Sequence, residues 1–257
     1  MQAADTHNFH DINKLPKEYG ILVFPISISR AQNKTGQEPD KYVEYLKYFS
    51  PSKVSAPKAG VNFVYSDSLY LHSDERASVL KYKFMNIVLN HKNSMQKLLF
   101  KERQNFQIQH AFSYEVWNQF YLSYDGNFAS DLARFKEIYN SDERFLKYLK
   151  EDADFVGRKL DENQINFFLE EHLMIYLSSK KKISLPNEYI MGREQWVLWA
   201  YPGVPLKAQL YTYQLNPLNL DAPENPYQNH SYDLESKVLT DALKVDLDSY
   251  NYKYPKQ

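Results

Sequence analysis

Residues 20–29 read GILVFPISIS, a short apolar run rich in β-branched residues between Gly20 and a polar stretch. Its length suits a buried strand better than a helix. An amphipathic helical pattern follows at 40–49 (DKYVEYLKYF), and a second strand pattern lies at 61–67 (VNFVYSD). Strand, helix and strand in this order indicate a parallel βαβ unit. We therefore predict an α/β fold that begins with a parallel βαβ unit.

The rest of the chain divides into helical, strand and loop patterns. Further helices are predicted at 77–104, 113–124, 130–140, 142–160 and 163–182, and a short terminal one at 236–250. Strands are predicted at 194–203 and 205–215, and residues 216–234 read as a loop rich in proline and asparagine. These patterns predict a polar lead at 1–19, one domain at 20–215 and a C-terminal extension at 216–257.

Composition argues against several classes of function. The 257 residues include 7 glycines and no GxGxxG or GxxxxGK[ST] string, which disfavours nucleotide binding by those loops. The absence of cysteine excludes disulfides, thiolate catalysis and cysteine-based zinc sites, and no metal is predicted. No secretory signal precedes residue 20, and the longest apolar stretch, 21–28, is too short to span a membrane. The expectation is a soluble, cytoplasmic protein that does not bind membranes.

Two serines follow the first predicted strand. Ser27 and Ser29 would lie at its carboxyl end, where open α/β sheets bind their ligands. A serine hydroxyl can act as an acyl nucleophile when a neighbouring base activates it. The alternative is that both serines only cap a loop.

A pair of glutamates lies inside the predicted helix at 163–182. Glu170 and Glu171 are about 100° apart on a helix, so one of them at most points fully into an apolar site. A carboxyl held among Phe167, Met174 and Ile175 would favour its neutral form unless a cation paired with it. Such a group suits binding a substrate ammonium and accepting its proton. The alternative is that both are solvated on the outer face.

Tyr201 ends an apolar run and precedes Pro202, so its hydroxyl would lie at a strand end. It is either part of a site or a core tyrosine with a satisfied hydroxyl.

The helix at 77–104 is strongly basic in a chain of net charge −1. The stretch contains six basic residues and one acidic residue, Glu102, so its net charge is 6 − 1 = +5. Such a stripe could contact nucleic-acid phosphates, or could be an ordinary solvated face. The predicted contacts are Lys81, Lys83, Lys92, Lys97, Lys101 and Arg103.

The order of these motifs resembles that of tRNA-dependent cyclodipeptide synthases. That family has a serine after its first strand in an apolar–apolar–Gly–apolar–Ser pattern, which residues 25–29 resemble with Ser29 at the nucleophile position and Ser27 at the glycine position. An Asp-x-Leu-x-x-His motif is matched by residues 67–72. A basic helix comes next, and residues 139–156 resemble the family's following helical stretch.

Two later motifs complete the resemblance, which runs from about residue 21 to 206. The family's Tyr-x-x-x-Glu helix reads Phe167 to Glu171 here, and one subfamily has the pair found at Tyr201 and Pro202. Phe167 lacks the hydroxyl of the family's tyrosine, which favours the alternative of a catalytically inactive Rossmann-like protein that binds tRNA or acts as an adaptor.

The resemblance implies a Rossmann-like parallel sheet flanked by helices, similar to the catalytic domain of class Ic aminoacyl-tRNA synthetases. HIGH- and KMSKS-like strings are missing, so the substrates would be two aminoacyl-tRNAs, used in turn by a monomer without a cofactor. Ser29 would form an aminoacyl-enzyme, Glu171 would hold its α-ammonium, and Tyr201 would relay a proton when a dipeptidyl-enzyme cyclises to a diketopiperazine. The residues implied to line the pocket are Pro25, Ser27, Phe167, Met174, Trp199 and Pro202.

Overall fold

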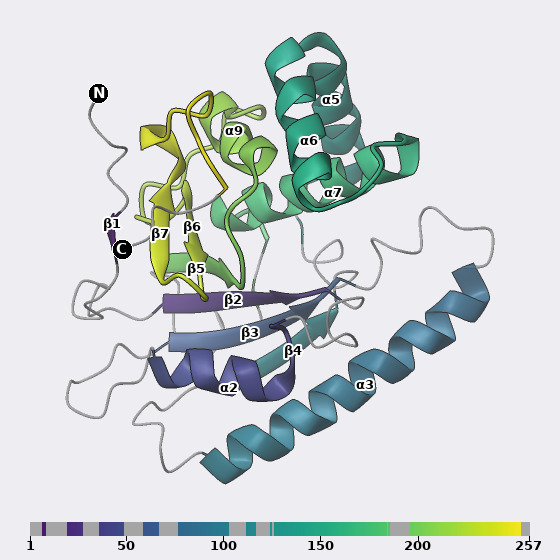
Figure 1. Ribbon diagram of the computed structural model, residues 1–257, viewed down its shortest axis with the longest axis vertical. Coiled ribbons are helices and arrows are strands. Elements are labelled where there is room, and N and C mark those ends of the chain that lie inside the picture. The colour runs from purple at the N-terminus through teal and green to yellow at the C-terminus, as the bar shows by residue number, and fades with distance from the viewer. Residues whose placement is uncertain are drawn as a thin grey trace.

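A seven-stranded sheet, in the order β1-β7-β6-β5-β2-β3-β4, forms the centre of the computed structural model (Figure 1). The structure describes residues 7–8, 20–27, 36–48, 59–66, 77–102, 112–116, 124, 126–183, 185 and 196–252. The strands are β1 (His7–Asn8), β2 (Gly20–Ile26), β3 (Ala59–Tyr65), β4 (Phe112–Val116), β5 (Trp196–Tyr201), β6 (His230–Asp233) and β7 (Val238–Asp241).

The topology is Rossmann-like. Strands β2 to β6 pair with one another in parallel. Strand β7 runs antiparallel to β6, and β1 runs antiparallel to β7. Numbered along the chain, the five parallel strands lie in the order 3-2-1-4-5, which is the doubly wound arrangement. The strand order therefore reverses between β2 and β5, and the predicted fold class is confirmed.

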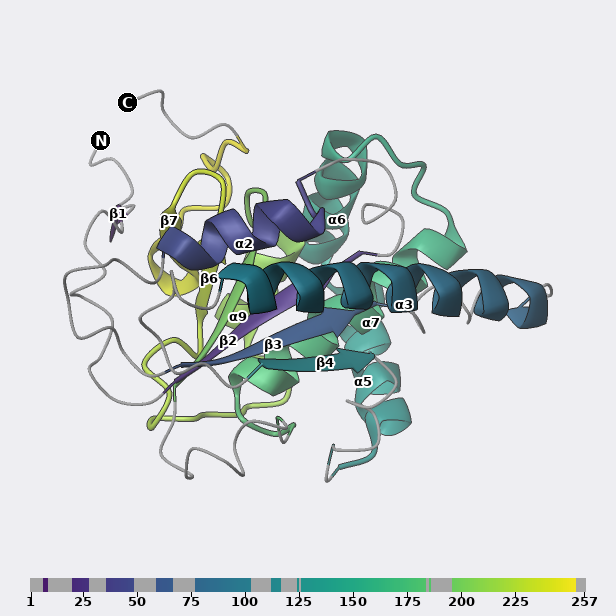
Figure 2. The ribbon, with the colours of Figure 1, turned by 90° about the horizontal axis from the view of Figure 1, so that it is seen from below.

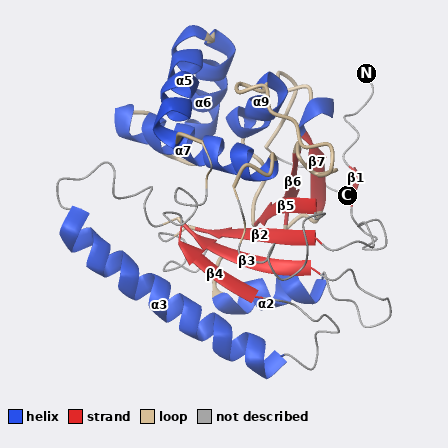
Figure 3. Ribbon diagram, turned by 180° about the vertical axis from the view of Figure 1, so that it is seen from behind, coloured by secondary structure: helices blue, strands red, loops and turns tan. Residues whose placement is uncertain are grey.

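Helices cover both faces of the sheet (Figure 3). One side carries α2 (Pro39–Tyr48) and α3 (Ala77–Glu102). The other side carries α5 (Phe128–Ser141), α6 (Glu143–Phe155), α7 (Glu162–Ser179) and α9 (Lys207–Leu215). In the described part of the chain, no helix is long and apolar enough to cross a membrane.

The two faces explain why residues 20–26 form an unbroken apolar run. Ile21 and Val23 pack into the core beneath α5, α6, α7 and α9, whereas Leu22 and Phe24 pack into the core beneath α2 and α3. A parallel strand that is buried on both faces needs apolar residues at every position.

Three of the predicted helices and strands were wrong, and the predicted loop at 216–234 was wrong at its end, where His230–Asp233 form β6. Residues 112–116 form β4 instead of a helix, because they pair with β3 and alternate apolar with polar side chains. Residues 207–215 form α9 instead of a strand, because Asp152 accepts hydrogen bonds from the first N–H groups of that helix. Residues 238–241 form β7, followed by a 3₁₀ turn (Ala242–Lys244), where a helix was predicted.

The sheet also continues past the boundary predicted at residue 215. Strands β6 and β7 come from the predicted C-terminal extension, and β1 comes from the predicted polar lead. Both regions therefore contribute strands to the sheet that carries the site.

Candidate functional site

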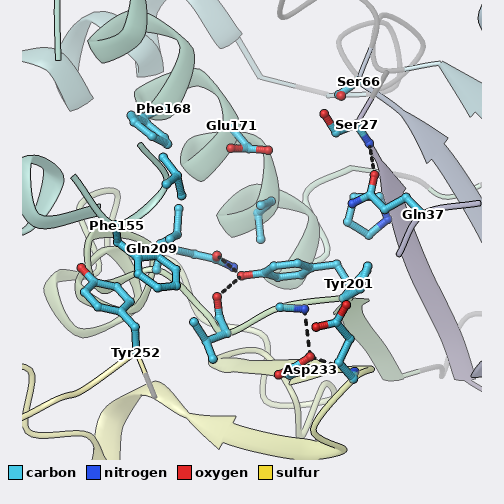
Figure 4. Close-up of a pocket in the computed structure, with 18 of the residues that line it drawn as sticks. Ser27, Gln37, Ser66, Phe155, Phe168, Glu171, Tyr201, Gln209, Asp233 and Tyr252 are labelled. Atoms are coloured by element: carbon cyan, nitrogen blue, oxygen red, sulfur yellow. Dashed lines mark hydrogen bonds between the residues drawn. The ribbon is translucent and has the colours of Figure 1, made fainter. Parts of the chain in front are cut away.

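A cavity of about 710 Å³ lies at the carboxyl ends of β2 and β5, where the strand order reverses (Figure 4). Ligands of doubly wound folds bind at this position. Six of the residues predicted to form the site line the cavity: Pro25, Ser27, Phe167, Glu171, Tyr201 and Pro202.

The end of β2 is held by two side chains that also line the cavity. The N–H of Ser27 donates to Oε1 of Gln37 at 2.7 Å. Ser66, directly after β3, donates from both its N–H and its hydroxyl to the carbonyl of Ile26. These contacts hold Ile26 and Ser27 in place. Ser29, the predicted nucleophile, lies outside the described residues, two positions further on.

A buried histidine on α3 connects that helix to the same strand end. Nε2 of His91 donates to the carbonyl of Gln37 at 2.8 Å, and Nδ1 accepts from the hydroxyl of Tyr65 at 2.9 Å. Burial lowers the pKa of His91, which favours this neutral form. His91 therefore positions Gln37, which in turn holds Ser27.

Only one of the two adjacent glutamates on α7 reaches the cavity. Glu171 lines it, whereas Glu170 does not and is 7% exposed. Burial raises the pKa of each carboxyl to about 7, and at Glu171 the guanidinium of Arg158 opposes this increase. Glu171 can therefore exchange a proton near neutral pH, and an ammonium ion in the cavity would favour its carboxylate.

Arg158 is a cavity residue that the sequence reasoning missed. Gly157 adopts a left-handed conformation (φ 69°) just after α6, and the N–H of Arg158 donates back to the carbonyl of Ala153 at 2.8 Å. The guanidinium then lies 5.3 Å from the ring centre of Phe167. A glycine after an amphipathic helix was the available signal for this turn.

Tyr201 lies between the two ends of the cavity in Figure 4. Its hydroxyl is 3.2 Å from Oε1 of Gln209 and 3.4 Å from the carbonyl of Val204, both of which are acceptors. The turn after β5 is held by Gly203 (φ 125°), whose N–H donates to Asp233 at 2.9 Å. The phenol therefore stands at a strand end with its proton directed to neighbouring oxygens.

Two predicted pocket residues belong to the core instead. Met174 and Trp199 are fully buried, and neither is among the described residues that line the cavity. The indole of Trp199 donates to the hydroxyl of Ser178 at 3.0 Å. One turn after Glu171, the residue that reaches the cavity is Ile175 at i+4, because α7 turns Met174 at i+3 into the core.

The basic residues of α3 lie away from the cavity. Lys83, Lys97 and Lys101 are exposed, and the ammonium of Lys92 lies 5.4 Å from the ring centre of Tyr114. Figure 2 shows the amino-terminal end of α3 extending beyond the rest of the fold. Of the other two predicted contacts, Lys81 belongs to α3 but its side chain is not described, and Arg103 lies outside the described residues.

Among the residues that the structure describes, no three histidine, aspartate or glutamate side chains gather so that they could hold a metal ion.

Comparison with known proteins gives similar solved structures only. No protein-family model and no curated protein matches the chain. A CDPS from Fluoribacter dumoffii is 18% identical over 76% of this chain and 82% of its own, with a TM-score of 0.48. A CDPS from Staphylococcus haemolyticus is 14% identical over 80% and 87%, with a TM-score of 0.47. A cyclodipeptide synthase from Candidatus Glomeribacter gigasporarum bound to Phe-tRNAPhe is 12% identical over 82% and 88%, with a TM-score of 0.44. None of the three is more than 18% identical to this chain.

Proposed function

We propose that this chain is a tRNA-dependent cyclodipeptide synthase, which joins the aminoacyl groups of two aminoacyl-tRNAs into a cyclic dipeptide. One observation carries the proposal: Glu171 on α7 and Tyr201 at the end of β5 line the same cavity as Ser27 at the end of β2. These are the three positions at which the sequence motifs require a carboxylate, a phenol and a serine-bearing strand end.

In the first step, the hydroxyl oxygen of Ser29 attacks the carbonyl carbon of an aminoacyl ester. The bond to the ribose oxygen breaks, and tRNA leaves with a proton. Glu171 holds the α-ammonium of the seryl-bound aminoacyl group and accepts a proton from it, a role suited to a carboxyl whose pKa is about 7.

The peptide bond forms when this amine attacks the ester carbonyl of a second aminoacyl-tRNA. The bond to the ribose oxygen breaks, and the second tRNA leaves with the proton that the amine loses. Attack in the other direction would leave the dipeptide on tRNA and not on the enzyme. The terminal amine of the dipeptidyl-enzyme then attacks the seryl ester, which releases the diketopiperazine and regenerates the Ser29 hydroxyl. Tyr201 relays a proton in this step, and the oxygen of Gln209 beside it orients the phenol.

The exposed lysines of α3 supply the contact with tRNA in this proposal. Lys83, Lys97 and Lys101 point to solvent on a helix of 26 residues, about 39 Å long. Phosphate contacts of this kind give affinity without sequence selectivity and weaken as salt is added.

The test is to express the protein in bacteria and search the medium for diketopiperazines by mass spectrometry. Ser29→Ala should abolish product and retain tRNA binding, whereas Ser27→Ala should still form it. The opposite result would move the nucleophile by two residues. A wild-type protein that binds tRNA but forms no product would favour the inactive tRNA-binding alternative, for which Phe167 is the supporting feature.

A further inference from the structure

The end of the cavity farthest from Ser27 is closed by two stacked aromatic rings (Figure 4). Phe155, at the end of α6, and Tyr252, near the end of the described chain, have ring centres 4.2 Å apart and planes 8° apart. Phe155 is 48% exposed. The wall of the cavity at this end is therefore built jointly by α6 and by the C-terminal segment.

A buried carboxylate holds Tyr252 in place. The phenol donates to Oδ1 of Asp152 at 2.5 Å, and Asp152 also accepts the N–H groups of Lys207 and Ala208 at 2.8 Å each. Asp152 has no exposed surface. Because burial raises the pKa of Tyr252, the phenol remains a donor. The ring therefore has one orientation, which the start of α9 and the end of α6 define together.

The residues before Tyr252 tie the segment across α6 and α9. Asp248 accepts from Nζ of Lys147 at 2.9 Å and from the hydroxyl of Tyr148 at 3.1 Å. The hydroxyl of Tyr250 donates to the carbonyl of Pro205 at 2.9 Å. Asp248 is thus held by α6, and Tyr250 by the residue two positions before α9. Residues 248–252 form an anchored strap that brings Tyr252 to the wall of the cavity.

Two residues beside this wall are apolar. Val156 follows Phe155 directly, and Leu206 precedes Lys207; both line the cavity. The ammonium of Lys207 is turned from the cavity toward Glu151, which it meets at 2.6 Å, and it lies over the ring of Tyr252 at 5.6 Å. A group that reaches this end therefore meets hydrocarbon and aromatic surface.

We propose that the ring of Tyr252, stacked on Phe155, limits the size of the apolar side chain that the cavity accepts from one of its two aminoacyl groups. This inference rests on the proposed function for the identity of the ligand. The C-terminal strap acts in this way as a specificity element: it carries no reacting group, and it closes the cavity from outside the parallel strands.

The test measures binding and product separately. Alanine, leucine and phenylalanine methyl esters are titrated by NMR into the full chain and into Tyr252→Ala, Phe155→Ala and Tyr252→Phe. Shortening either ring should raise the affinity for the phenylalanine ester relative to the alanine ester by about 10-fold, as expected for opening a hydrophobic pocket. Tyr252→Phe keeps the ring, so it should keep the wild-type ratio and only lower the unfolding temperature.

Each outcome decides between the alternatives. Because Phe155 is half exposed, Phe155→Ala should fold even if Tyr252→Ala does not. An unchanged ester ratio in Phe155→Ala, an altered ratio in Tyr252→Phe, or no binding of any ester to the wild type would overturn the proposal. Absence of diketopiperazine from the wild type would count against the proposed function alone, because the ester ratio requires no turnover. Where product forms, Tyr252→Ala should shift it toward larger residues.

Discussion

The Glu171→Gln substitution tests whether burial controls the charge at the centre of the cavity. The folded protein raises the pKa of this carboxyl from 4.5 to about 7. One pKa unit corresponds to about 1.4 kcal/mol, so ionised Glu171 costs the folded state at most about 3.5 kcal/mol. Water in the cavity reduces this value, because the carboxyl lines an accessible space.

The direction in which stability changes with pH follows from proton binding. Because the pKa is higher in the folded than in the unfolded protein, the folded state binds more protons between about pH 4.5 and pH 7, and stability is lost as pH rises through this window. Glutamine has no proton to lose, so its free energy of unfolding does not fall in this way. As the pH is raised from about 5 to about 8, the free energy of unfolding of Glu171→Gln should increase relative to that of the wild type by up to about 3 kcal/mol.

The assay is urea unfolding followed by circular dichroism at both pH values. Glu162→Gln, an exposed position in the first turn of the same helix, is the matched control and should not show this difference. Arg158→Gln should raise the pKa of Glu171 further, because the guanidinium favours the carboxylate. If the stability difference between Glu171→Gln and the wild type were the same at both pH values, the argument from burial would be refuted.

Four further substitutions, one of them a control, test the tRNA surface and the fold. Lys97→Glu should weaken tRNA binding and lower the slope of log K against log salt by about 1, whereas Lys150→Glu, exposed on α6, should not; filter binding at several salt concentrations measures both. Asp152→Ala should lower the free energy of unfolding by about 2–4 kcal/mol, because buried donors lose their acceptor, as urea denaturation would measure. Gly20→Ala would put its Cβ 1.8 Å from the indole of Trp196 and should cost about 1–3 kcal/mol by the same assay.

The helices and strands that were predicted correctly have strong local signals. The run at 20–26 is apolar throughout because its strand is buried on both faces, and α3 is long enough for its pattern to stand out. One error arose where the pattern was ambiguous. In α9, Lys207 to Tyr213 are all buried, so the helix shows no polar face that would distinguish it from a strand.

The residues of the site also fall into those that the sequence predicted and those that only the structure revealed. The motifs predicted that Glu171 and Tyr201 belong to one site, and both line the cavity. No pattern indicated that Arg158 and Tyr252 would join them. Tyr252 is held at the cavity by contacts with distant residues, among them Asp152, a hundred positions earlier, which accepts its hydroxyl.

The sequence by itself determined the βαβ start, the basic helix and the types of side chain at the strand ends, because these depend on residues close together in the chain. The tertiary structure alone decided that β6 and β7 extend the sheet, that Ile175 and not Met174 lines the cavity, and that the C-terminal strap closes it. Those outcomes depend on which distant segments come into contact. Burial and hydrogen-bond partners decide this, and the local pattern of apolar residues contains no information about them.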